Sequence, residues 1–169
     1  MTESLLSLII SIIALLIALV TFFLRNRLAS APRTDGADSF SSRPLQLQAY
    51  ERLALLAERI ALPNMVSRLN QPGISALEMQ RLLLETIKQE YEYNASQQIY
   101  VSAPTWEAVK SLKDQNMLII NQVAGTLPPD AQGIDLNRRL LEFVMNQSKG
   151  QLHTIVLEAL SFEAKKLMK

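Results

Sequence analysis

Residues 44–63 read PLQLQAYERLALLAERIALP, and this stretch decides the class of fold. Apolar side chains recur in it every three or four residues, at Leu45, Ala49, Leu53, Leu56 and Ile60. This spacing is typical of an α-helix that buries one face. Pro44 suits the first turn of such a helix, and Pro63 is expected to end it. The segments that follow have the same period, so we predict an all-α domain.

The sequence after this helix predicts a short helical turn and then a longer helix. The turn is expected over 64–69, and Gln71-Pro72-Gly73 forces a break after it. Ser75 and Glu78 then form a capping box, in which each side chain satisfies a free backbone amide. We expect this helix to run to about Gln98. Its predicted apolar face consists of Leu77, Leu83, Leu84, Ile87 and Tyr91.

A third long helix is predicted to begin after Ser102, a favourable N-cap residue, and to end at Gly125. Trp106, in its first turn, is interpreted as a core anchor in preference to a binding platform. The loop 127–133, LPPDAQG, is expected to be a rigid turn whose glycine permits a positive φ.

Asp135 is expected to cap the next helix, and a final helix follows from Leu152. No stretch alternates with period two for long enough to predict a strand. Residues 44–169 are therefore expected to form one compact bundle of about four to five helices.

The N-terminal run Leu5–Leu24, LLSLIISIIALLIALVTFFL, contains no charged residue. A helix of this length crosses about 30 Å of hydrocarbon. We therefore predict a transmembrane anchor over residues 1–27 that contacts membrane lipid through residues 5–24. The alternative is a cleaved signal peptide, but the leader carries Glu3, and the run exceeds the roughly 7 to 15 residues typical of such peptides.

Small side chains recur along this run at alternating intervals of three and four residues: Ser7, Ser11, Ala14, Ala18 and Thr21. These five residues are called the small-residue seam below. Small residues allow two membrane helices to approach closely. The seam therefore predicts a homodimer that pairs through the transmembrane helix.

Residues 28–43, LASAPRTDGADSFSSR, are predicted to be a flexible tether, because they have little apolar periodicity with which to form a core. Arginine follows the apolar run at four positions and precedes it at none: Arg25, Arg27, Arg33 and Arg43. Positive residues favour the cytoplasmic side. We therefore expect the N-terminus outside and the C-terminal domain in the cytoplasm.

Charge and composition narrow the classes of function. Four of the 17 Lys and Arg residues and three of the 16 Asp and Glu residues precede Pro44, which leaves 13 of each sign in the domain. This balance gives no indication of a nucleic-acid partner, because binding nucleic acid usually requires a clustered basic surface. The chain contains no cysteine. We identify no catalytic constellation, metal site or cofactor motif, so an enzyme is the less favoured interpretation.

The densest polar cluster lies in residues 90–100. On a continuous helix, Glu90, Asn94 and Gln98 would lie along one face at intervals of four residues. Tyr93 and Tyr100 complete this candidate polar interaction face. One interpretation is a structural layer that joins two helices, and the other is a face that binds a ligand or partner. His153 is the only histidine and has no companion at a local spacing.

Three segments carry a resemblance: LQAYERL at 47–53, NASQQIYVS at 94–102 and LPPDAQG at 127–133. With the leading apolar helix, they resemble an uncharacterised family of single-pass, membrane-anchored helical proteins from Bacteroidota. The resemblance implies a bacterial inner-membrane setting. It implies no activity and no site residue.

Two classes of function stay open at this point. The first is a membrane-tethered helical interaction or scaffold module with an unknown protein partner, which self-associates through the small-residue seam. The alternative is an enzyme or small-ligand binder that uses the polar face of Glu90, Asn94 and Gln98. A concave site with convergent polar groups would favour the ligand, and an exposed apolar surface would favour the partner.

Topology provides a direct test. A reporter that works only in the cytoplasm should be active when it is fused after Lys169, because the arginine excess lies on the domain side of the apolar run. A reporter that works only in the periplasm provides the control at the same fusion point. Activity of that second reporter would contradict the predicted orientation.

Overall fold

The computed structural model describes residues 42–146 and 152–169, and these residues form six α-helices and one 3-10 helix. The α-helices are α2 (Arg43–Ile60), α3 (Leu62–Leu69), α4 (Ala76–Tyr93), α5 (Ala103–Ala124), α6 (Gly133–Asn146) and α7 (Leu152–Leu167). The 3-10 helix η1 (Ala95–Ile99) connects α4 to α5. The predicted all-α class is confirmed for this part of the chain. It has one α-helix more than the upper end of the expected number.

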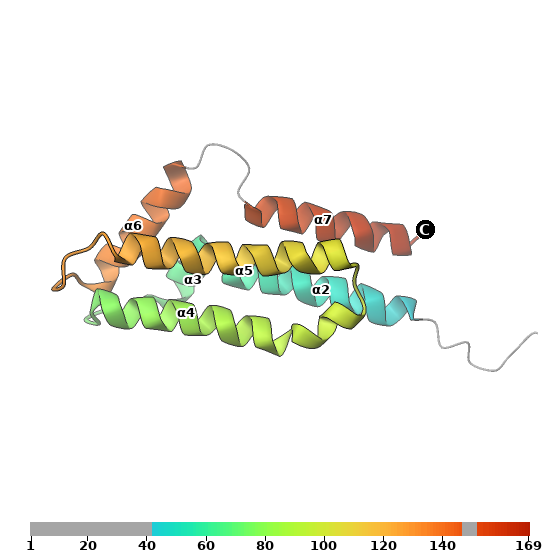
Figure 1. Cartoon of the computed structure of the whole chain (residues 1–169), viewed down its shortest axis with the longest axis horizontal. Coiled ribbons are helices and arrows are strands. Elements are labelled where there is room, and N and C mark those ends of the chain that lie inside the picture. The colour runs from blue at the N-terminus through green and yellow to red at the C-terminus, as the bar shows by residue number, and fades with distance from the viewer. Residues whose placement is uncertain (1–41, 147–151) are drawn as a thin grey trace, which may run out of the picture. The chain divides into compact units, whose positions relative to one another are not determined.

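Helices α2, α4, α5 and α7 form the long part of the bundle (Figure 1). Helix α7 packs against α2 and α5, and α4 packs against α5 and α2. The two shorter helices α3 and α6 contact each other and α4. The core between them contains large side chains with almost no exposed surface: Leu53, Leu56, Ile60, Met65, Met79, Leu83, Ile87, Leu112, Ile120, Leu136, Leu140 and Leu160. Each such side chain contributes about 1.5–3 kcal/mol through burial.

The helix of residues 44–63 ends earlier than its sequence predicts. Helix α2 stops at Ile60, because Ala61 leaves the helical region with ψ of 127°. Pro63 does not end α2 but lies in the first turn of α3, where a missing N–H costs no hydrogen bond. The expected short turn at 64–69 is therefore a separate helix that begins at Leu62.

Side chains donate hydrogen bonds to the free backbone carbonyl groups at the end of α2. A helix leaves its last carbonyl groups without partners in its own backbone. Asn64 Nδ2 donates to the Glu58 carbonyl at 2.9 Å, and Arg68 Nη2 donates to the Arg59 carbonyl at 3.2 Å. Asn116 Nδ2, buried on α5, donates to the Ile60 carbonyl at 2.8 Å. The first two bonds join α3 to the end of α2, and the third holds this end against α5.

Helix α4 begins as predicted and ends early. Ser75 and Glu78 form both halves of the capping box. The buried residues of α4 include Met79, Leu83 and Ile87, whereas Leu77, expected on the apolar face, is exposed. The helix ends at Tyr93 instead of continuing to about Gln98.

The LPPDAQG loop pairs with the segment before α4. The Ala76 N–H donates to the Ala131 carbonyl at 2.9 Å, and the Gly133 N–H donates to the Ile74 carbonyl at 2.8 Å. Gly133 does not have the positive φ that its loop position suggested, since among the described residues only Gly73 has one, at 83°. Gly133 is instead required by close approach of the backbone of the α3–α4 connection.

Asp135 caps α6 from inside the helix. Helix α6 begins at Gly133, two residues before Asp135, and the Asp135 carboxylate accepts from the Gln132 N–H at 3.1 Å. The sequence predicts that Asp135 caps this helix, and it does stabilise the start of α6, but from a position inside the helix and not as the N-cap residue.

The predicted transmembrane anchor, the small-residue seam (Ser7, Ser11, Ala14, Ala18 and Thr21) and most of the predicted tether lie outside the described residues. Within residues 42–146 and 152–169, no helix combines the length and apolar character that crossing a bilayer requires.

Substituting Gly133 by Ala should lower the free energy of unfolding by about 1–3 kcal/mol, because the new methyl group overpacks the loop. Its Cβ would lie 3.1 Å from Met79 Cβ and 3.2 Å from the Ile74 carbonyl oxygen, and neither atom is the end of a flexible side chain. Chemical denaturation followed by circular dichroism measures the change.

Gly125 offers the matched control. It has a helical φ of −65°, and a Cβ there meets its nearest neighbour at 3.4 Å. Gly125→Ala should therefore leave stability unchanged or raise it by less than about 1 kcal/mol. Equal effects of the two substitutions would contradict the close-approach explanation for Gly133.

Candidate functional site

The early end of α4 divides the predicted polar face. Glu90 and Tyr93 belong to α4, and Asn94 is the residue at which the helix ends. Gln98 lies in η1, and Tyr100 follows it. Asn94 is buried, and its Nδ2 donates to the Glu90 carbonyl at 2.8 Å. The predicted stack of Glu90, Asn94 and Gln98 on one helix face is therefore not formed.

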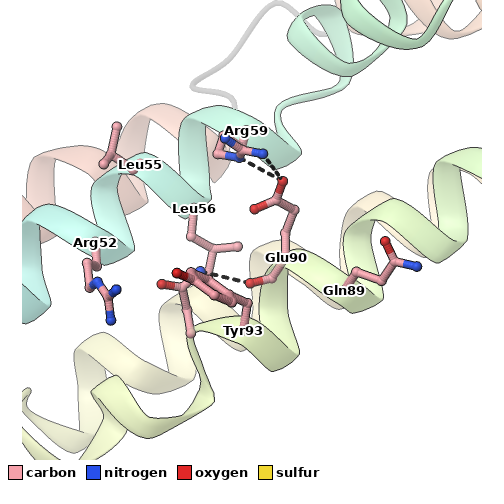
Figure 2. Close-up of a pocket in the computed structure, with 8 residues that line it drawn as sticks. Arg52, Leu55, Leu56, Arg59, Gln89, Glu90 and Tyr93 are labelled. Carbon is pink, nitrogen blue, oxygen red and sulfur yellow. Dashed lines mark hydrogen bonds and ion pairs between the residues drawn. The ribbon is translucent and has the colours of Figure 1, made fainter.

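Three of the five predicted residues instead line a groove between α2 and α4 (Figure 2). The groove has a volume of about 550 Å³. Helix α2 contributes Arg52, Leu55, Leu56 and Arg59, and the other wall consists of Gln89, Glu90, Tyr93 and Asn94. Gln98 and Tyr100 do not line it. We call this concavity the α2–α4 groove.

An ion pair closes one end of the α2–α4 groove. Glu90 Oε1 accepts from Arg59 Nε at 2.7 Å and lies 2.5 Å from Arg59 Nη2. The Glu90 side chain is 14% exposed, whereas that of Arg59 is 54% exposed. Hydrogen bonding to Glu90 raises the pKa of Arg59. An ion pair this exposed contributes little to stability, but it does orient the carboxylate.

The other end of the groove is cationic and apolar. The Arg52 guanidinium carbon lies 5.6 Å from the centre of the Tyr93 ring. Tyr93 is 72% exposed, and Leu55 on the rim of α2 is 62% exposed. Leu56 is buried beneath them (Figure 2). Sequence reasoning identified Tyr93 but none of the α2 residues, because their proximity to α4 depends on a turn between the two helices.

The α2–α4 groove is better suited to binding than to chemistry. Glu90 is the only carboxylate among its lining residues, and it is already engaged by Arg59. A general base must itself accept the proton that it removes, and the lining residues offer no histidine or second carboxylate for that role. Arginine and tyrosine are enriched at protein interfaces, and an exposed leucine adds apolar area beside them.

A second polar cluster attaches α7 to the bundle. Tyr50 donates to Glu163 Oε2 at 2.6 Å, and Ser102 donates to Glu163 Oε1 at 2.8 Å. Tyr50 lies in α2, Ser102 precedes α5 and Glu163 lies in α7, so one carboxylate joins three helices. No local spacing in the sequence could have revealed this cluster, because Tyr50 and Glu163 are 113 residues apart.

The pKa values in this cluster are shifted by its hydrogen bonds. Burial and the bond to Glu163 raise the pKa of Tyr50 to about 12. Burial also raises the pKa of Glu163, but the hydrogen bonds that it accepts from Tyr50, Ser102 and Thr105 outweigh burial, so its pKa is lowered. Both shifts favour the same state of the cluster, in which the Tyr50 phenol is neutral and the Glu163 carboxylate is ionised. The cluster is therefore a structural link and not an acid and base pair.

His153 has a carboxylate companion that the sequence did not reveal. Its Nε2 is buried without a hydrogen bond and lies 3.4 Å from Glu58 Oε2 of α2. Asn64 Nδ2 also donates to this Glu58 oxygen, at 3.0 Å. Across the described ranges, no three His, Cys, Asp or Glu side chains are grouped closely enough to hold a metal ion. The contact of His153 with Glu58 brings α7 next to α2.

Comparison with known proteins places the chain in a family without providing an activity. The sequence matches the model of a family of unknown function, DUF7935, across residues 1–167. No curated protein and no solved structure matches the chain. The α2–α4 groove therefore has to be interpreted from its own residues.

Replacing Tyr50 by Phe should lower the free energy of unfolding at pH 7 by about 1.5–3 kcal/mol, the net contribution of a hydrogen bond to a charged group. Because the folded pKa of Tyr50 is raised from 10.0 to about 12, its contribution is complete below pH 10 and is lost as the pH rises towards 12. The difference in stability between wild type and Tyr50→Phe should therefore shrink over this range. Urea denaturation at a series of pH values measures it.

Tyr93→Phe is the control for this experiment, since Tyr93 is exposed and should show no such pH dependence. On the acid side the sign is opposite, because the pKa of Glu163 is lowered from 4.5 and its contribution is lost as the pH falls through the folded value. A stability difference for Tyr50→Phe that stays constant from pH 8 to pH 12 would contradict the proposed link.

Proposed function

The chain belongs to DUF7935, a family of unknown function, and from its own residues we propose that it is a membrane-anchored interaction module that binds a protein partner in the α2–α4 groove. The observation that carries this proposal is the exposed pair Leu55 and Tyr93 beside Arg52 on the walls of a groove. Exposed apolar side chains next to arginine are typical of binding surfaces.

The proposed anchor is the apolar run Leu5–Leu24. Its length and lack of charge support a single membrane span, and the arginines that follow it support a cytoplasmic domain. We propose the inner membrane of a bacterium of the Bacteroidota as the setting, with the N-terminus outside. Residues 28–43 would then tether the domain close to the membrane surface.

Self-association is a second part of the proposal. The small-residue seam of Ser7, Ser11, Ala14, Ala18 and Thr21 supports pairing of two transmembrane helices. A homodimer would present two α2–α4 grooves on the same side of the membrane. A partner with two binding segments would then be held more tightly than by either groove alone.

A small-molecule ligand is the alternative that one observation favours. The groove volume of about 550 Å³ lies within the range of ligand pockets. Against it, the groove is open, and the Glu90 carboxylate is already paired with Arg59. Ligand sites usually present polar groups that are free to orient the ligand. The partner is therefore the better supported of the two.

Site-specific photocrosslinking in native membranes tests the proposal. A photoreactive phenylalanine analogue in place of Tyr93, on the groove wall, should give a discrete adduct of protein mass. The same analogue in place of Leu118 is the control, because Leu118 is 55% exposed but lies on α5, outside the groove. No adduct from position 93, or the same adducts from both positions, would contradict groove binding.

The same membranes test self-association when a bifunctional crosslinker replaces the photoreactive residue. A species of twice the chain mass should form, and it should weaken when Ser11 and Ala14 are both changed to Leu, since the larger side chains separate the helices. Leu8→Ile with Leu15→Ile is the matched control, because these changes lie off the small-residue seam. A dimer that is equally abundant in all three proteins would remove the seam from the proposal.

A further inference from the structure

The α2–α4 groove has the length and periodicity of a helix-binding surface. Its α2 wall is formed by Arg52, Leu55, Leu56 and Arg59, which span two helical turns, and its α4 wall runs from Gln89 to Tyr93 and ends at Asn94. The two turns of α2 correspond to about 10 Å along its axis, and the α4 wall spans about 8 Å. A third helix laid along such a groove makes contacts at intervals of three, four and seven residues. A groove of this form therefore fits a helical segment better than a compact headgroup.

Of the two arginines that line the groove, only Arg59 is neutralised by a carboxylate in the part of the chain that the structure describes. Arg59 is paired with Glu90, and Arg68 also approaches Glu90 Oε1, at 4.0 Å. Arg52 makes no ion pair with any residue in the described ranges, and its guanidinium faces the Tyr93 ring. The lining residues therefore contain two arginines and one carboxylate. Negative charge on an occupant would complement the Arg52 end of the groove.

The apolar surface lies between the two arginines. Figure 2 shows Leu56 and Tyr93 between Arg52 at one end and the pair of Arg59 and Glu90 at the other, with Leu55 on the outer rim. An apolar side chain on the occupant would bury against Tyr93 and Leu55, which are otherwise mostly in solvent.

On these grounds, which rest on the proposed function, we propose that the partner segment is an acidic amphipathic helix. One of its carboxylates pairs with Arg52, and an apolar side chain lies on Tyr93 and Leu55. A second carboxylate about two turns along the same helix reaches Arg59, because Arg52 and Arg59 are seven residues apart on α2. In that position it competes with Glu90. Glu90 therefore acts as an internal substitute for the partner while the groove is empty.

A selection from a display library of helical peptides, with randomised surface residues, tests this assignment on the full-length purified chain. The enriched peptides should carry net negative charge and an apolar stripe. Fluorescence anisotropy of the best peptide should show about 5-fold or greater weakening with Arg52→Glu, the change expected for loss of about 1 kcal/mol. Arg139→Glu is the control, since Arg139 lies on α6 outside the groove.

Glu90→Gln separates the assigned contact from simple damage to the fold. Removing the competing carboxylate frees Arg59, so the acidic peptide should bind several-fold more tightly, whereas a disrupted groove would bind it more weakly. Weaker binding by this variant would therefore overturn the role of Glu90. Enriched peptides without acidic bias, or acidic peptides that are insensitive to Arg52→Glu, would overturn the assignment of the partner.

An anionic lipid surface is the alternative occupant of the groove, and the same variants test it. Phosphatidylglycerol vesicles that compete with the peptide, with binding that Arg52→Glu weakens equally, would show that the groove binds lipid headgroups. This result would overturn the proposal of a helical partner. A protein adduct at position 93 together with a selection that lacks acidic bias would leave the interaction module intact and remove only the acidic helix. No adduct at position 93 together with a selection that lacks acidic bias would remove both proposals.

Discussion

The break between α2 and α3 is the constraint on which the rest of the domain depends. Three successive carbonyl groups, those of Glu58, Arg59 and Ile60, each accept a hydrogen bond from a side chain. Of the three bonds only the one to Ile60 is buried, and a buried carbonyl without a partner is costly, so a chain that ends a helix in its core has to supply a donor there. The Ile60 carbonyl is satisfied by Asn116 from α5, and this contact fixes the end of α2 in the core.

The same break positions the groups that surround it. The side chain of Glu58 faces His153 of α7, and that of Arg59 faces Glu90 of α4. Ile60, the next residue, is fully buried, and its carbonyl accepts from Asn116 of α5. Successive residues of one helix turn thus contact α7, α4 and α5. The α2–α4 groove follows from this arrangement, since the ion pair of Arg59 and Glu90 marks one end of it and Arg52, two turns earlier, marks the other.

The three segments that carry the family resemblance have structural roles that can now be stated. LQAYERL contributes Tyr50, and NASQQIYVS contributes Ser102, and both donate to the carboxylate of Glu163 on α7. LPPDAQG contributes Gly133, where a Cβ would lie only 3.1–3.2 Å from atoms of Ile74 and Met79. All three segments join elements that are distant along the chain.

The sequence by itself determined the all-α class, the capping box at Ser75, the start of α5 at Ser102 and the end of α5 near Gly125. These features depend on periodicity and on caps within a few residues, which are properties of a local segment. Sequence reasoning misplaced the ends of α2 and α4, because a helix end is decided by which donors and acceptors the rest of the fold brings to it. The sequence also did not reveal why position 133 is a glycine, because the close neighbours of Gly133, Ile74 and Met79, are brought to it by the fold. Only the tertiary structure decided that Glu90 and Tyr93 face Arg59 and Arg52 across a groove, since these pairs are 31 and 41 positions apart and their proximity depends on how the helices between them turn.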